Sequence, residues 1–192
     1  MRKLAFAAAV LAGATLFTAP QAASASAAQA SGTLTFRGMT LKLPSGWRVY
    51  GGADGVKVVT GRCAKPHSAY FTPNCEAFWI FGPKQIKYGR ELFSAYRGDQ
   101  PYYPATDVQR CPFDAKSGQT FGDAYASGLR QVGRGHKAAF KGWRGECYSY
   151  NGSKRTGTFR QREWFLPTSK ILVVDVWDNP RLASVLGAAT WS

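Results

Sequence analysis

The sequence has few of the residues on which most enzyme active sites depend. Its only histidines are His67 and His136, and 11 acidic residues stand against 25 lysines and arginines. It contains no G-x-S-x-G, S-x-x-K or H-E-x-x-H motif and no P-loop. These absences argue against the enzyme classes that the motifs define, and no cofactor is expected.

A long apolar run occurs only near the start of the chain. Residues 4–17 carry no charge, follow a short basic stretch and precede a series of small residues. This order is typical of a secretory signal peptide, with cleavage after Ala30 favoured over Ala25 or Ala27. Because a membrane-spanning helix needs roughly 20 apolar residues, we expect a signal peptide at residues 1–30 rather than an anchor.

The rest of the sequence, residues 31–192, has the length of a single domain. Its longest aliphatic run covers only residues 171–174, so no integral membrane segment is expected after signal cleavage. The protein is therefore predicted to be secreted, either extracellular or associated with the cell envelope.

Positive charge dominates and is concentrated in one part of the sequence. The formal net charge is +14, and Glu146 is the only acid between residues 130 and 162. A field of this sign attracts polyanions and acidic surfaces, so we expect a protein or an anionic cell-envelope polymer as the partner. The candidate anion-binding residues are Arg134, Lys137, Lys141, Arg144, Arg155, Arg160 and Arg162. Aromatic residues lie between these cations, where they would either stack on a ligand or fill the core.

Four cysteines, Cys63, Cys75, Cys111 and Cys147, are present. An even number in an exported domain predicts two disulfides. Of the three possible pairings we favour Cys63–Cys75 with Cys111–Cys147, because the first closes a short loop rich in turn residues. In the chain-entropy model these bonds are worth about 3 and about 4 kcal/mol. No C-x-x-C pair exists, so a metal site is not expected.

Hydrophobic periodicity predicts an α+β domain with a mostly antiparallel sheet, one or two packed helices and two disulfides. The alternation slips at Arg37-Gly38, which predicts a hairpin over residues 33–43. Asp175 and Asp178 are three positions apart near the end of a predicted strand, so we expect them on opposite faces without a joint role. Further strands are expected at residues 47–50, 56–59, 77–81, 146–150, 156–166 and 170–177, helices at 91–97 and 180–186, and a long loop at 98–119.

The opening of the domain shows a resemblance to a known family. The segment Phe36-Arg37-Gly38-Met39-Thr40-Leu41-Lys42-Leu43-Pro44-Ser45-Gly46-Trp47 resembles the start of PsbP-like domains, where a short hairpin leads to a Pro-x-Gly-Trp turn and the next strand. The apolar strand at 170–177 followed by a terminal helix is similar to how such domains end. The resemblance implies a largely non-catalytic protein that binds other proteins, and it implies no site residue.

The interpretation we favour is an exported, non-catalytic binding protein, and two alternatives stay open. A secreted phosphodiester hydrolase would use Glu146 and His136 as its acid–base pair, with nearby arginines holding the phosphate. A secreted hydrolase inhibitor would insert the 98–119 loop, braced by Cys111, into its target.

Overall fold

The computed structural model describes residues 32–67 and 72–192. The predicted signal peptide at residues 1–30 lies outside the described residues. Within the described part the chain forms ten strands and two short helices: β1 (Thr33–Phe36), β2 (Met39–Lys42), β3 (Arg48–Gly52), β4 (Gly55–Cys63), β5 (Cys75–Phe81), α1 (Pro83–Lys87), β6 (Ser117–Gln131), β7 (Lys137–Ser149), β8 (Arg155–Leu166), β9 (Ile171–Asp175), α2 (Leu182–Gly187) and β10 (Thr190–Trp191).

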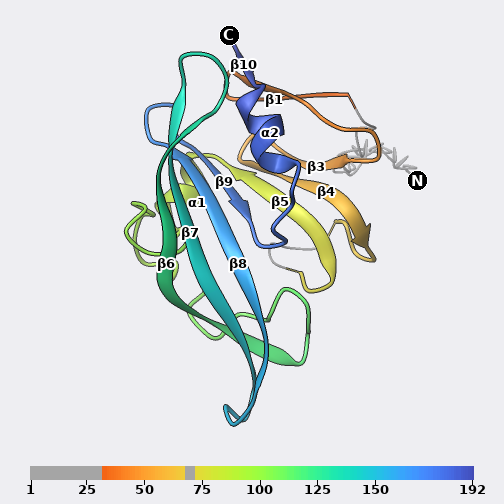
Figure 1. Ribbon diagram of the computed structural model, residues 1–192, viewed down its shortest axis with the longest axis vertical. Coiled ribbons are helices and arrows are strands. Elements are labelled where there is room, and N and C mark those ends of the chain that lie inside the picture. The colour runs from red at the N-terminus through yellow and green to blue at the C-terminus, as the bar shows by residue number, and fades with distance from the viewer. Residues whose placement is uncertain (1–31, 68–71) are drawn as a thin grey trace, which may run out of the picture.

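Seven of these strands form one antiparallel sheet in the order β3-β4-β5-β9-β8-β7-β6. Strands β6, β7 and β8 are much longer than the others and continue beyond the end of β9 (Figure 1). As a result, β9 pairs only with the segment of β8 from Arg162 to Leu166. The edge of β8 before Arg162 is therefore not covered by β9.

One face of the large sheet is covered by a small sheet, in the order β1-β2-β10, and by α2 (Figure 1). Leu34, Met39 and Leu41 of the hairpin pack with Leu182 and Leu186 of α2 in one buried cluster. The two leucines of α2 are four residues apart and so lie on the same side of the helix. Burying each of them contributes about 1.5–3 kcal/mol, which attaches the short helix to the sheet.

The opposite face of the large sheet is covered by the segment that connects α1 to β6. Its Tyr96, Tyr102 and Cys111 are buried against Val174 and Trp79 of the central strands. Much of the predicted 98–119 loop is therefore packed onto the sheet, and its last residues, from Ser117, belong to β6.

The prediction of an α+β fold is wrong, because the structure is mostly β. The helices α1 and α2 have five and six residues. The expected helix at 91–97 is replaced by turns, in which Glu91 and Leu92 adopt left-handed φ values of 49° and 60°. Five or six residues close too few backbone hydrogen bonds to form a stable helix alone, so these helices depend on their packing against the sheet.

The prediction of two disulfides is confirmed, with the favoured pairing of Cys63 to Cys75 and Cys111 to Cys147. Such bonds are compatible with an extracellular location. Across the described ranges, neither helix has the length and apolar character required to span a bilayer.

Candidate anion-binding groove

The structure distributes the seven predicted anion-binding residues over several places. Arg144 of β7 and Arg160 and Arg162 of β8 lie on one face of the sheet, because the register pairs Arg144 with Arg160 and Arg162 with Gly142. We call this side of β7 and β8 the arginine face. The others are Lys141 on the opposite face, Arg155 at the far end of β8, and Arg134 and Lys137 around the β6–β7 turn.

The arginine face borders a pocket of about 440 Å³, which we call the groove. It lies beside the open edge of β8 and is lined by Phe113, Arg144, Gly145, Glu146, Thr158, Phe159, Arg160, Val176, Trp177 and Asp178. A volume of this size falls within the range of ligand-binding pockets. The walls come from β7, β8, the segment after β9 and the residues that follow Cys111.

Arg144 and Arg160 are direct cross-strand neighbours on the wall of the groove. Arg160 lies 3.7 Å from a carboxylate oxygen of Asp178. Among the described residues, no side chain forms a hydrogen bond or ion pair with the Arg144 guanidinium. Because like charges directly opposite each other destabilise a sheet, an anionic group placed between the two arginines would relieve this repulsion.

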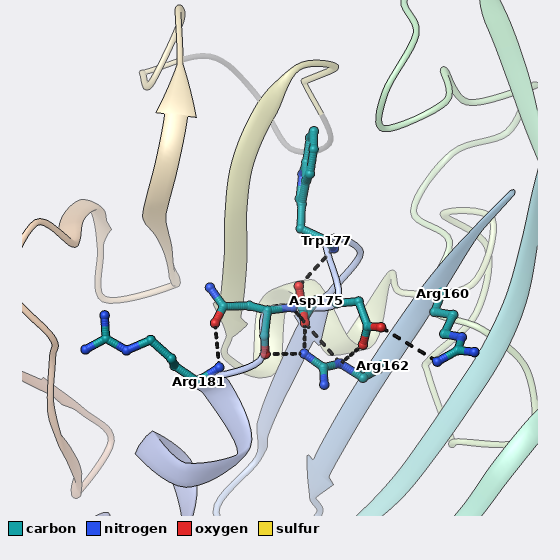
Figure 2. A network of polar contacts seen from close by, with 7 residues as sticks. Arg160, Arg162, Asp175, Trp177 and Arg181 are labelled. Carbon is teal, nitrogen blue, oxygen red and sulfur yellow. Dashed lines mark hydrogen bonds and ion pairs between the residues drawn. The ribbon is translucent and has the colours of Figure 1, made fainter. Parts of the chain in front are cut away.

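A polar network holds the segment that forms the far wall of the groove (Figure 2). The Arg162 guanidinium binds the buried Asp175 at 2.5 Å, Asp178 at 3.2 Å and the Asn179 carbonyl at 2.6 Å. Asp175 also accepts hydrogen bonds from the backbone N–H groups of Trp177 and Asn179. Burial raises the pKa of the Asp175 carboxyl, while Arg162 and these N–H groups oppose that rise.

The expectation that Asp175 and Asp178 have no joint role is wrong. Strand β9 ends at Asp175, and Asp178 has a left-handed φ of 50°, so the chain turns back toward β8. Both carboxylates therefore bind Arg162. The rule of alternating faces holds only within a strand, and here the strand ends between the two residues.

On the other side of β8 the groove borders a group of rings that we call the aromatic face: Phe113, Phe159 and Trp177. The rings of Phe113 and Trp177 meet edge to face at 4.7 Å, and those of Phe113 and Phe159 at 6.3 Å. Only Phe159 belongs to the aromatic residues that lie between the cations in the sequence. Phe113 comes from a predicted loop and Trp177 from the end of a predicted strand, and the position of Phe113 two residues after Cys111 is the one sequence feature that links it to β7.

The two disulfides lie close to the groove. Cys111 joins the Phe113 loop to Cys147 of β7, next to the groove residue Glu146. The backbone N–H of Asn74, which precedes Cys75, donates to the Pro112 carbonyl at 2.9 Å. These links hold the aromatic face against the strands and reduce the entropy that a ligand would otherwise lose by ordering it.

The structure does not bring Glu146 and His136 together, since they lie toward opposite ends of β7, ten residues apart along an extended strand. His136 stacks on Trp191 with ring centroids 4.0 Å apart. Glu146 accepts hydrogen bonds from the Tyr148 hydroxyl and from Arg155, which lower the pKa of its carboxyl and keep it ionised. In the described ranges, no group of three or more His, Cys, Asp or Glu side chains is arranged to hold a metal ion.

Comparisons with protein-family models, with curated proteins and with solved structures gave no match to this chain. The geometry of the groove and the charge around it therefore indicate the function.

Proposed function

We propose that this protein is an exported, non-catalytic binding protein whose groove receives the anionic groups of an acidic protein segment or a cell-envelope polymer. The observation that carries the proposal is the pair of opposed arginines, Arg144 and Arg160, on the wall of a pocket. An anion bound between them would form charge-assisted hydrogen bonds to both guanidinium groups, which are about twice as strong as hydrogen bonds between neutral groups.

The remaining cations support this function in a different way. Arg134 and Lys137 are exposed and lie away from the groove, so they would not contact a ligand held there. The formal net charge of +14 would still attract an anionic partner over a distance and speed its association. The long-range field and the local site thus have separable roles, and the PsbP-like resemblance agrees with a binding protein.

The test is heparin binding measured by titration calorimetry between 50 and 200 mM NaCl. The double variant Arg144→Gln/Arg160→Gln should bind at least tenfold more weakly, and the dependence of its affinity on salt should become less steep. The matched control is Arg134→Gln/Lys137→Gln, which removes the same charge at the other end of β7. Equal losses in the two variants would show that charge acts diffusely, and the groove would be rejected as the site.

A further inference from the structure

The edge of β8 is exposed where it borders the groove. Strand β8 begins at Arg155, but its pairing with β9 begins only at Arg162. Its other edge pairs with β7 along almost its whole length. Within the described ranges, no backbone group bonds to the open edge between Thr156 and Gln161. An open edge of this kind is a template for a further strand.

The groove extends beside this open edge. Thr158, Phe159 and Arg160 line it from β8, and Trp177 and Phe113 line it from the opposite wall. The other outer strand of this region, β6, is less regular, because its register with β7 shifts twice between Phe121 and Ala126, whereas β8 has one shift, at Thr156, and pairs regularly with β7 from Gly157 onward. Such irregularities are a known means of preventing edge pairing. The edge of β8 thus combines open backbone groups with walls for side chains.

The two faces of β8 differ in chemistry at this place. Arg144 and Arg160 lie on the arginine face, whereas Phe113, Phe159 and Trp177 lie on the aromatic face. An added strand would direct alternate side chains to these two faces, because successive residues of a strand point in opposite directions. The two carboxylates that also line the groove, Glu146 and Asp178, are already paired with arginines, so acidic side chains would meet Arg144, which has no ion pair among the described residues. Apolar side chains would meet the rings.

We propose that the groove binds an extended polypeptide segment that adds to the edge of β8 and alternates acidic with apolar residues. This inference rests on the proposed function, since it names the class of anionic ligand that the groove receives. Main-chain hydrogen bonds to β8 supply affinity in this mode of recognition, and the alternating side chains supply specificity. A polyanion without this alternation would contact the arginine face but would place no apolar side chains against the aromatic face.

The experiment uses labelled eight-residue peptides and fluorescence anisotropy with the purified, oxidised protein. The first probe is an acetylated, amidated peptide of four Glu-Val repeats. The second has the same composition in the order Glu-Glu-Val-Val, repeated twice, and therefore the same charge. Two further probes are Glu-Val peptides with N-methyl groups on every Glu or on every Val, which block one or the other edge of the peptide strand.

We expect the alternating peptide to bind at least tenfold more tightly than the block peptide, and at least one N-methylated form to lose tenfold or more. Phe113→Ala should weaken the alternating peptide roughly three- to tenfold and leave the block peptide unchanged. Phe113 is 40% exposed, so its removal leaves the core intact. Phe93→Ala, which removes an 81% exposed ring from another loop, is the control and should change neither affinity.

The outcomes separate this inference from the function on which it rests. If all four peptides bind equally while Arg144→Gln/Arg160→Gln weakens each of them, the groove is an anion site without strand addition, and the inference is overturned. If no peptide binds at millimolar concentration while heparin binding still depends on Arg144 and Arg160, the inference alone is overturned. If the arginine substitutions change the affinity for neither peptide nor heparin, both proposals are overturned. Loss of alternating-peptide binding in the arginine and Phe113 variants, together with sensitivity to N-methylation, supports both.

Discussion

Arg162 and Asp175 are opposite each other on β8 and β9, and their side chains form an ion pair at 2.5 Å. Asp175 is fully buried, whereas the Arg162 side chain retains 14% of its exposure. The pair lies where β9 ends, and the same guanidinium holds the Asn179 carbonyl. Because the segment between Asp175 and Asn179 forms one wall of the groove, this ion pair determines the shape of the site.

Substituting Asp175 should therefore be costly. Asp175→Ala leaves the Arg162 guanidinium with the exposed Asp178 as its one ion-pair partner among the described residues, and it leaves the N–H groups of Trp177 and Asn179 without the acceptor they have in the structure. We expect a loss of about 3–5 kcal/mol in the free energy of unfolding, measured by urea denaturation. As a control, Asp54→Ala removes the exposed pair with Lys84 and should cost less than about 1 kcal/mol. Similar losses in both variants would contradict a structural role for the buried pair.

A second buried carboxylate, Glu163, attaches the segment after α1 to the sheet. It is fully buried and accepts hydrogen bonds from the Tyr96 hydroxyl, the Tyr102 backbone N–H, the Trp143 indole and the Gln161 amide, at 2.6–2.7 Å. Burial raises the pKa of Glu163 above its ordinary value of 4.5, and the four hydrogen bonds oppose that rise.

This raised pKa has a consequence for stability. A carboxyl whose pKa is higher in the folded state contributes stability below the unfolded pKa, and it loses that contribution as pH rises through the folded pKa. Glu163→Gln cannot titrate. We therefore expect the free energy of unfolding of the wild type, minus that of the variant, to fall as pH rises from 4.5 toward 8. Urea denaturation across this range provides the measurement. A difference that stays constant with pH would mean that the hydrogen bonds balance the effect of burial on the pKa of Glu163, and one that rises would mean that they outweigh it.

Sequence reasoning succeeded where a local pattern determines the structure. The slip in alternation at Arg37-Gly38 predicted the β1–β2 hairpin, and both turn residues have positive φ, at 52° and 84°, with Phe36 paired to Met39. A two-residue turn of this kind matches the twist of the flanking strands. The favoured disulfides are also predicted, because an even number of cysteines in an exported domain favours disulfide bonds and the spacing favours a bond that closes the short loop between Cys63 and Cys75. The terminal helix was predicted too, although it begins only at Leu182.

Sequence reasoning failed where tertiary context determines the structure. Strand β6 is the longest strand of the described residues, yet the sequence pattern predicts no strand there, and the first residues of β6 fall within the loop predicted at 98–119. Most of it is exposed, and its register shifts near Phe121 and Ala124 interrupt the two-residue period. The groove could not be predicted either, since it requires β9 to end at Asp175 while β8 continues. Where one strand ends beside another depends on the packing of the whole sheet.

The two disulfides should contribute unequally to stability. Cys111–Cys147 closes a separation of 36 residues and Cys63–Cys75 one of 12. In the chain-entropy model the corresponding contributions are about 4 and about 3 kcal/mol. Paired alanine substitutions, compared by urea denaturation, should therefore give the larger loss for Cys111→Ala/Cys147→Ala. A larger loss for the shorter loop would show that native-state contacts, rather than loop entropy, decide the difference.

Arg144 should lower stability in the absence of a ligand, because it faces Arg160 directly and has no side-chain ion pair among the described residues. Arg144→Gln removes the repulsion and keeps much of the side chain's length, so we expect the unfolding free energy to rise by about 0.5 kcal/mol at low salt. The gain should shrink in 0.5 M NaCl, where charges are screened over a few ångströms. Arg134→Gln, an exposed control in the β6–β7 turn, should show a smaller change. The same Arg144 variant should bind heparin more weakly, as expected when a binding site keeps a locally unfavourable charge. A loss of stability in Arg144→Gln, or a gain that does not depend on salt, would mean that the two arginines do not repel each other across the groove wall.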